Sequence, residues 1–374
     1  MPERVPTDVG EDPHFLSRQL PSYLGNKRSL LGAIDTAICL VRERVGNRRL
    51  ATFDPFCGSG AVSRLMKQHS HTLTSADLEH YASALARTYL TNRTSVDIAA
   101  IERLAVELNR EVDANPVDDG FIRRLYSPAD DRRILPGERV FYTVSNARRL
   151  DSYLRLLGEL DADHRTMLLG PLLVSASVHA NTGGVFKGFY KDRITGIGKL
   201  GGTNADALVR ITGSIRLEPP VLSRFESQIR VAQGDAKVVA QSVSNIDLTY
   251  LDPPYNQHPY GSNYFMLNLI ATNRAPQTTS TVSGIPTDWQ RSRYNVRRHA
   301  AGALHDLIAH LDSRFVLISY SDEGFIRPHE MHDLLASFGT TTVTDIRYPT
   351  YRASRNLGSR PLHVTEHLYL LERR

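Results

Sequence analysis

Asp252, Pro253, Pro254 and Tyr255 directly follow a mostly apolar run, Ile246 to Leu251. The amino group of an aromatic base is a weak nucleophile because its lone pair is delocalised into the ring. The Asp252 carboxylate and the Pro253 carbonyl could accept both N–H bonds of such an amine and draw its nitrogen towards tetrahedral geometry. The two prolines would fix the backbone and offer no competing donors. These residues suggest methylation of an exocyclic base amine.

Tyr255 adds a ring that could stack on a base. An enzyme that acts on a base must first take it out of the double helix, and an aromatic pocket offsets part of that cost. The alternative interpretation is a plain Pro-Pro turn that ends a buried strand. A four-residue motif remains a hypothesis until the rest of the chain agrees with it.

A second group of residues lies near the N-terminus. Leu50 to Phe53 is predicted to be a strand, Asp54 to Gly60 a tight loop, and a helix should begin at Ala61. Gly58 and Gly60 permit positive φ and a close approach of the backbone to a ligand, as nucleotide-like cofactors require, although the pair could equally be structural. The loop lacks the Lys-Ser/Thr ending of a phosphate loop, which disfavours a triphosphate ligand.

Two further carboxylates follow predicted strands. Asp77 ends the strand Thr72 to Ala76, at about the interval after the glycine loop at which a carboxylate holds ribose hydroxyls. Asp235 follows the strand Gln228 to Ala232. It is either a cofactor contact or a solvated turn residue, and the sequence does not separate the two.

In their order and composition, four segments resemble the adenine-specific DNA methyltransferases of the D12 class, to which the Dam enzymes belong. They are Tyr23 to Lys27, Asp54 to Gly60, Asp77, and Asp252 to Tyr255. The resemblance spans most of the chain. It implies S-adenosylmethionine as methyl donor and an adenine N6 amine in double-stranded DNA as acceptor.

The resemblance also implies roles for single residues. Tyr23 and Lys27 would lie along the methionine part of the cofactor, Asp77 would hold the ribose, and Asp252 would touch both cofactor and target amine. The implied catalytic residues are Asp252, Pro253, Pro254 and Tyr255, and the implied cofactor site is Tyr23, Lys27, Asp54, Phe56, Gly58, Gly60, Asp77, Asp235 and Asp252. Cys57 is interpreted as a small packing residue of the cofactor loop.

The order of the predicted strands favours an α/β fold. Further strands are predicted at Phe315 to Tyr320, Thr341 to Arg347 and Val364 to Glu372. We expect a Rossmann-like, mostly parallel sheet of the class I methyltransferase type with an antiparallel edge strand and an inserted target-recognition module. The predicted divisions are a disordered tail at 1–12, a cofactor-binding half at 13–105, the recognition module at 106–225 and a catalytic half at 226–374.

Basic residues occur in three groups, each with aromatic neighbours, although the net charge is only +5. Cations that neutralise phosphates beside rings that stack on bases suit a partner such as double-stranded DNA. The alternative for any one group is a solvated basic surface with ordinary buried rings. The predicted DNA contacts are Lys187, Lys191, Arg293, Arg297 and Arg355.

Other features exclude some classes of protein. His329 and His332 lack the spacing of a zinc helix, so no metal is expected. Two cysteines cannot form a disulfide framework, and no apolar run approaches the length of a membrane span. The expected location is cytoplasmic.

Several alternatives share the fold. Methylation of cytosine N4 would use the same amine geometry, and RNA or a protein glutamine are further substrates, although such relatives more often carry Asn at the position of Asp252. A DNA-binding protein without catalysis is a different class, which the presence of Lys27, Gly58, Asp77 and Tyr255 disfavours. A cognate restriction endonuclease could share the recognised sequence without forming a stable complex.

Overall fold

The computed structural model describes residues 10–202, 205–349 and 363–374. Within these ranges, seven strands form one sheet in the order β3-β2-β1-β4-β5-β7-β6. All of the predicted strands are present, and β4 has the predicted bounds. The strands are β1 (Leu50–Asp54), β2 (Ser70–Asp77), β3 (Gln228–Gln233), β4 (Ile246–Leu251), β5 (Ser313–Ser321), β6 (Gly339–Pro349) and β7 (His363–Arg373).

The pairing along the sheet is parallel from β3 to β5 and antiparallel beyond it. β7 runs antiparallel to both β5 and β6, with Ser319 opposite Leu368 and Val343 opposite Tyr369. The antiparallel pairing predicted at this edge is therefore confirmed, with β6 as the edge strand. The mostly parallel α/β sheet expected of a class I methyltransferase is confirmed with it.

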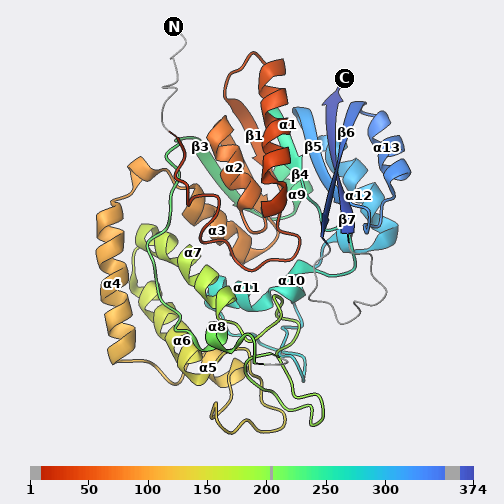
Figure 1. Ribbon diagram of the computed structural model, residues 1–374. Coiled ribbons are helices and arrows are strands. Elements are labelled where there is room, and N and C mark those ends of the chain that lie inside the picture. Colours follow the sequence, from red (N-terminus) through yellow and green to blue (C-terminus); the bar gives the residue numbers. More distant parts are fainter. Residues whose placement is uncertain (1–9, 203–204, 350–362) are drawn as a thin grey trace.

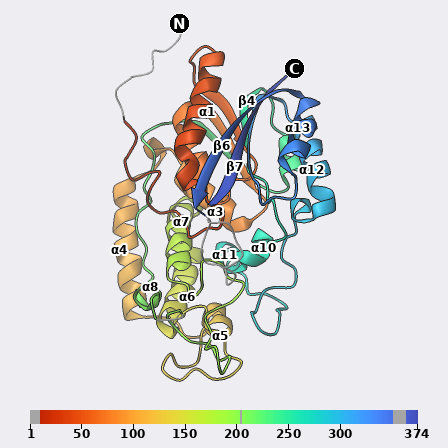
Figure 2. The ribbon, with the colours of Figure 1, turned by 45° about the vertical axis from the view of Figure 1, so that its right-hand side comes forward.

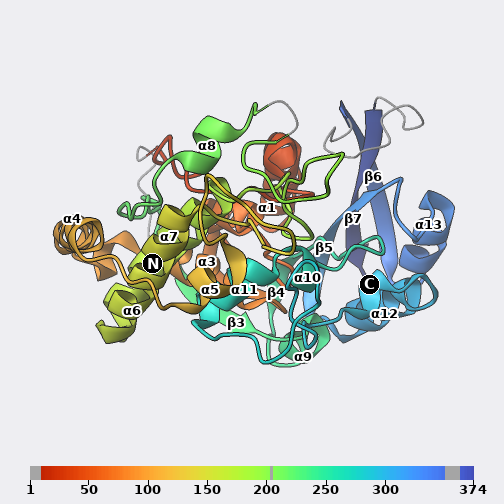
Figure 3. The same cartoon turned by 90° about the horizontal axis from the view of Figure 1, so that it is seen from below.

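Helices cover both faces of the sheet, as the alternation of side chains along its strands requires. In β5, Phe315 and Leu317 join the core beneath α1, α2 and α3, whereas Val316 and Ile318 join the core beneath α9, α12 and α13. Figure 3 shows α1 and α9 on opposite sides of the sheet. These helices are α1 (Leu31–Arg44), α2 (Ala61–His69), α3 (His80–Leu90), α9 (Ala236–Ala240), α12 (Arg297–His310) and α13 (Pro328–Ala336).

A group of helices lies beyond the end of the sheet, below it in Figure 1, and remains there when the molecule is turned (Figure 2). The predicted helix at Asn146 to Gly158 is part of α6, and the apolar run Met167 to Val178 is part of α7. The group contains α4 (Ile98–Ala114), α5 (Phe121–Tyr126), α6 (Val144–Glu159), α7 (Ala162–Val178) and α8 (Leu208–Thr212). The division into four parts stays a prediction. Residues 1–9 of the predicted tail lie outside the described residues, and the boundary at 105/106 falls inside α4.

Two shorter helices connect this group to the sheet. α10 (Tyr260–Asn263) and α11 (Phe265–Thr272) follow β4, and α11 packs against both α3 and α7. One-turn 3-10 helices lie at Arg28–Leu30, Arg93–Ser95 and Arg293–Asn295.

The strand order reverses between β1 and β4, because β2 and β3 extend the sheet on one side and β5 on the other. In open α/β sheets, ligands bind at such a switch point, outside the carboxyl ends of the strands. The residues of interest follow β1, β2 and β4, so the fold places them together.

Candidate active site

A cavity opens at the carboxyl ends of β1, β2 and β4. It has about 850 Å³ of empty space, including the part open to solvent, which is the size of a small-molecule site. Eight of the nine residues in the expected cofactor site line it, and Gly60 lies in the same loop without lining it. Those that line it are Tyr23, Lys27, Asp54, Phe56, Gly58, Asp77, Asp235 and Asp252.

Lys27 is held between two carboxylates on the floor of the site. Its Nζ lies 3.0 Å from Asp252 Oδ1 and 2.9 Å from Glu366 Oε1. Lys27 is 5% exposed and Glu366 is fully buried, whereas the Asp252 side chain keeps 20% of its surface exposed. Asp252 is therefore the most accessible member of this group, although Lys27 also lines the cavity.

The protonation of this group follows from burial and charge. Burial raises the pKa of Asp252 to about 6, Lys27 lowers it and Glu366 raises it. Burial alone would lower the pKa of Lys27, but Asp252 and Glu366 outweigh it and hold that pKa well above its usual value. Lys27 thus stays charged, and Asp252 is ionised at neutral pH.

Asp54 is buried behind the loop that it begins. Ser63 Oγ donates to its Oδ2 at 2.6 Å, and the N–H of Phe56 donates to its Oδ1 at 3.2 Å. Burial raises the pKa of Asp54 to about 7, against these hydrogen bonds. The carboxylate shapes the turn from β1 into α2 and so fixes the loop that lines the cavity.

Asp77 joins the end of β2 to the glycine loop. Its Oδ2 accepts a hydrogen bond from the N–H of Gly58 at 2.8 Å, and its Oδ1 accepts one from the N–H of Glu79 at 2.9 Å. Burial raises the pKa of Asp77 to about 6, while both backbone donors oppose the shift. Gly58 has φ +48, and a Cβ there would lie 3.1 Å from Tyr23 Oη, so the loop needs glycine at this point.

Tyr23 lies in a stack of tyrosines at one side of the cavity. Its ring stacks on Tyr260 at 5.2 Å and on Tyr264 at 4.6 Å between centroids, and its hydroxyl is 3.0 Å from that of Tyr81. The hydroxyl of Tyr264 accepts the N–H of Leu24 at 2.6 Å. The segment before β1 is thereby fixed against α10 and α11.

The predicted catalytic motif, Asp252 to Tyr255, lies partly in the wall of the cavity and partly in the interior of the protein. Asp252 and Pro254 line the cavity, whereas Pro253 is buried. Tyr255 packs edge-on against Tyr320 at 6.0 Å, and Lys27 Nζ lies 5.9 Å from the centre of its ring. Tyr255 is therefore next to Lys27 and only partly buried.

Asp235 is exposed at the start of α9 and also lines the cavity, so its role as a cofactor contact stays a prediction. Its side chain caps α9 by accepting the N–H of Lys237 at 3.0 Å and of Val238 at 3.4 Å. Cys57 is buried in the loop, and burial raises the pKa of its thiol well above the usual value. A packing role fits this environment.

Sequence reasoning missed Glu79, Tyr260 and Glu366. Glu79 is buried against the cavity, and burial raises its pKa to about 8, while Asn268 Nδ2, which donates to it at 2.6 Å, lowers the pKa. Glu79 lies two positions after Asp77, which was a usable signal. Tyr260 and Glu366 reach the site through α10 and the antiparallel strand β7, and no local pattern in the sequence marks them.

The predicted DNA contacts lie on the surface where they are described. Lys187, Lys191, Arg293 and Arg297 are exposed, and Arg355 falls outside the described residues. Three of their aromatic neighbours are buried. Phe186 and Phe189 pack around Phe141, and Tyr294 packs edge-on against Phe56 of the glycine loop and also lines the cavity. Phe186 and Phe189 therefore fill the core, as the alternative interpretation had it, and stacking on bases by the other rings stays a prediction.

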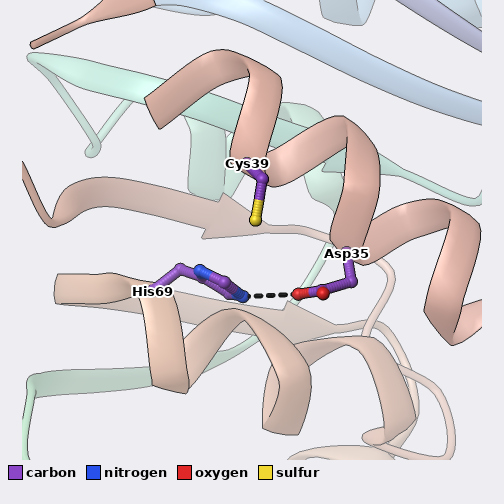
Figure 4. A group of neighbouring side chains, drawn as sticks. All are labelled: Asp35, Cys39 and His69. Carbon is purple, nitrogen blue, oxygen red and sulfur yellow. Dashed lines mark hydrogen bonds and ion pairs between the residues drawn. The ribbon is translucent and has the colours of Figure 1, made fainter. Parts of the chain in front are cut away.

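Asp35, Cys39 and His69 form a group of possible metal ligands between α1 and α2 (Figure 4). His69 Nε2 already lies 2.6 Å from Asp35 Oδ1, and Arg42 Nη1 is 3.4 Å from the other ring nitrogen. Burial lowers the pKa of His69, so its contact with Asp35 is a hydrogen bond from a neutral imidazole, and the prediction that the chain binds no metal stays a prediction. His329 and His332 are exposed on α13, as expected. None of the helices in the described parts of the chain is long and apolar enough to cross a bilayer.

Known methyltransferases resemble this chain over most of its length. It is 26% identical to the type II methyltransferase M.NlaIII of Neisseria lactamica over 360 residues, which cover 94% of this chain and 99% of the relative. It is 26% identical to the type II methyltransferase M.CviAII of Paramecium bursaria Chlorella virus 1, over 88% of this chain and 92% of that protein. It is 25% identical to the modification methylase StsI of Streptococcus sanguinis, over 94% of this chain and about half of that protein, 52%.

A family description matches the chain in two pieces, residues 23–123 and 215–334. The first piece contains Lys27, the glycine loop and Asp77, and the second contains Asp235 and the Asp252 to Tyr255 motif. The matched family is the D12 class of N6 adenine-specific DNA methyltransferases. These pieces hold the carboxylates that the fold gathers around one cavity, and the chain belongs to this family.

Proposed function

We propose that this chain transfers the methyl group of S-adenosylmethionine to the N6 amine of an adenine flipped out of double-stranded DNA, at a specific sequence. The observation that carries the proposal is Asp252 at the carboxyl end of β4, reachable from a cavity that the glycine loop of β1 also lines. Membership of an adenine-specific family supports adenine over cytosine.

The chemistry of the cavity fits this methyl donor. The titratable side chains that line it include five carboxylates, those of Asp54, Asp77, Glu79, Asp235 and Asp252, and one lysine. S-adenosylmethionine carries a sulfonium, an ammonium and a carboxylate, so an acidic cavity with one cation complements it. In this proposal Tyr23 and Lys27 lie beside the methionine part and Asp77 takes the ribose hydroxyls, while the Asp54 to Gly60 loop surrounds the cofactor.

The bound cofactor would supply a methyl group made electrophilic by the sulfonium. Asp252 and the Pro253 carbonyl accept the two N–H bonds of the target amine, which returns the nitrogen lone pair from the ring for attack. Tyr255 stacks on the flipped base. Proximity and fixed charges supply most of the acceleration, so no covalent bond to the protein is needed.

The helices below the sheet supply sequence recognition in this proposal. Residues 124–214 lie between the two matched pieces of the family, which is where members that read different sequences would differ. Lys187 and Lys191 belong to this segment. Lys191 and Gly198 form an isolated antiparallel β-bridge, and the loop between them carries Ile194, which has 95% of its surface exposed. The lysines of such a loop suit contact with DNA phosphates, and its exposed apolar side chain suits insertion at an unstacked step between base pairs.

The biological setting in this proposal is a restriction-modification system. The relatives named above are type II methyltransferases or a modification methylase. A cognate endonuclease would read the same sequence independently, so no stable complex between the two proteins is expected. DNA as substrate supports a cytoplasmic location.

The deciding experiment is transfer from methyl-labelled S-adenosylmethionine to unmethylated double-stranded DNA, followed by mass spectrometry of the digested nucleosides. We expect N6-methyladenine. N4-methylcytosine would keep the mechanism and change the base, whereas label in RNA or protein without label in DNA would reject the proposed substrate. Protection of the product DNA against a panel of endonucleases would then identify the recognised sequence.

A further inference from the structure

We propose that Glu366 is a positioning residue for methyl transfer, which shares the Lys27 ammonium with Asp252 and so keeps the Asp252 carboxylate available to the target amine. This proposal rests on the proposed function of Asp252. Glu366 lies on β7, beyond the segments that match the family, and no motif of the sequence points to it.

The geometry begins with the register of the sheet. β7 places Glu366 opposite Ser321, at the carboxyl end of β5, although β7 itself runs the other way. This antiparallel insertion brings a side chain from the end of the chain to the ends of the parallel strands. Glu366 is fully buried there, and Ser319 Oγ donates to the same Oε1 that contacts Lys27.

Lys27 Nζ therefore has two anionic partners at nearly equal distance, 3.0 Å to Asp252 and 2.9 Å to Glu366. An ammonium group offers three N–H donors on a flexible stem, so its position depends on where its partners hold it. With Asp252 alone as counter-ion, the ammonium would concentrate its charge on the carboxylate that has to accept the amine. Glu366 takes part of that charge and fixes the ammonium at the rear of the site.

Charged and titratable groups face Asp252 from several elements. Lys27 lowers the pKa of Asp252, while burial, Glu366 and Asp77 raise it. The other groups with which Asp252 interacts are Asp54 at the end of β1, Tyr250 on β4, and Tyr255 and Tyr260 after β4. Removing the Glu366 charge takes away one repulsion on the Asp252 carboxylate, and it leaves Asp252 as the remaining carboxylate partner of the Lys27 ammonium. Both changes lower the pKa of Asp252.

A purely structural role is the alternative: Glu366 could merely neutralise a buried lysine. Loss of such a partner lowers the amount of folded enzyme, and the missing charge moves the acid limb of kcat in either case. The value of kcat on the alkaline plateau therefore separates the two roles, since a merely structural partner leaves the plateau kcat of the folded enzyme unchanged, whereas loss of a positioning residue lowers it with both KM values unchanged.

The test is Glu366→Gln, which keeps the shape and removes the charge. In steady-state assays with labelled S-adenosylmethionine and substrate DNA, we expect the acid limb of kcat to move to lower pH by about one unit. We also expect kcat at pH 8 to fall about ten-fold or more, with both KM values within about two-fold of wild type. An unchanged kcat at pH 8 in folded Glu366→Gln protein would overturn the proposal, whatever the acid limb does.

Two companion variants sharpen the test. Glu372→Gln is the matched control, because Glu372 lies on the same strand and also contacts two cations, Arg44 and Arg314, but at the opposite end of β5. Its profile should equal wild type. Ser319→Ala removes the hydroxyl that shares Glu366, so Glu366 should draw Lys27 more strongly and move the acid limb to higher pH.

Opposite shifts in the two variants cannot come from general damage to the fold. If Glu366→Gln does not fold, Ser319→Ala still tests the proposal. An acid limb of kcat that stays in place or moves to lower pH in Ser319→Ala would overturn the proposal. Inactive wild-type enzyme on every DNA substrate would instead reject the proposed function, so the two failures are distinguishable.

Discussion

The backbone N–H of Gly58 donates to Asp77 Oδ2 at 2.8 Å, which ties the loop after β1 to the end of β2. The two strands are neighbours, so this hydrogen bond closes the wall of the cavity between them. The loop can reach Asp77 because Gly58 has φ +48.

Gly58→Ala should weaken cofactor binding. The positive φ disfavours alanine, and its Cβ would lie 3.1 Å from Tyr23 Oη, so either the loop or the tyrosine must move. We expect the Kd for S-adenosylmethionine in calorimetry to rise about ten-fold, which corresponds to roughly 1.4 kcal/mol. Gly302→Ala is the control, because that site on α12 has open space and a helical backbone, and the variant should bind normally. Unchanged affinity in Gly58→Ala would remove the loop from the cofactor site.

Asp252→Ala should abolish methyl transfer while DNA binding persists. The variant removes an acceptor for the amine, and we expect a loss of at least about a thousand-fold in kcat, the size of effect seen when a key electrostatic group is removed. Activity is measured with labelled cofactor and DNA binding by gel shift. Asp333→Asn, on the exposed surface of α13, should match wild type in both assays. Residual transfer near the wild-type rate would exclude Asp252 as the catalytic carboxylate.

The rate of methyl transfer should fall in acid. Burial raises the pKa of Asp252 to about 6, and only the ionised carboxylate accepts the amine N–H bonds. The carboxylate is present above pH 6 and is lost as the pH falls through it, so kcat should rise with pH and level off above about 7. Asp77 titrates near the same pH, so the apparent value belongs to the group as a whole. A kcat that stays constant from pH 5 to 8 would contradict this assignment.

The stability of the cofactor-free protein should decrease as the pH rises from about 5 to about 8. The pKa of Asp54 is raised to about 7 and that of Glu79 to about 8, because burial disfavours their charged forms. A carboxyl with a raised folded pKa binds its proton more tightly in the folded state, so it stabilises the fold at low pH and this contribution is lost as the pH rises through the folded pKa.

Urea unfolding of the wild type and Asp54→Asn at both pH values measures this effect. The amide cannot ionise, so the variant should show a smaller difference between the two midpoints. Equal pH dependence in the two proteins would mean that Asp54 does not contribute.

Lys187→Ala and Lys191→Ala should weaken DNA binding without changing kcat at saturating DNA. Each exposed lysine can neutralise one phosphate, so the slope of log K against log salt should fall by about one for each lysine removed. Arg314→Ala is the matched control, since Arg314 is also a surface cation but pairs with Glu372 on the sheet. Equal salt slopes in all three variants would place the DNA elsewhere.

The sheet was predictable because central strands such as Ile246 to Leu251 are apolar runs, while the closing runs Thr341 to Arg347 and Val364 to Glu372 alternate between apolar and polar residues. The glycine loop and Asp77 were predictable for a related reason, since both directly follow a strand and parallel strands end at the same edge. Local signals therefore indicated that the loop and Asp77 meet at one edge of the sheet, whereas their cofactor roles came from the family resemblance and stay a prediction.

The rest of the site depends on pairings between distant parts of the chain. Glu366 reaches Lys27 only because β7 inserts antiparallel between β5 and β6, and the sequence of β7 does not reveal its position in the sheet. Phe186 and Phe189 stand beside lysines in the sequence, yet they pack around Phe141 in the core. Neighbouring residues on an irregular segment have no fixed periodicity, so the sequence cannot assign their faces.

Lys27, Asp252 and Glu366 come from the beginning, the middle and the last strand of this chain, yet they form one ion-pair group. Chains fold during synthesis from the N-terminus onward. The glycine loop and Asp252 could be in place while β7 is still inside the ribosome, but the Lys27 ammonium would then have one counter-ion instead of two. If the proposed roles hold, a nascent chain would have the wall of the cavity before it had the complete ion-pair group, and full activity would begin only when β7 enters the sheet.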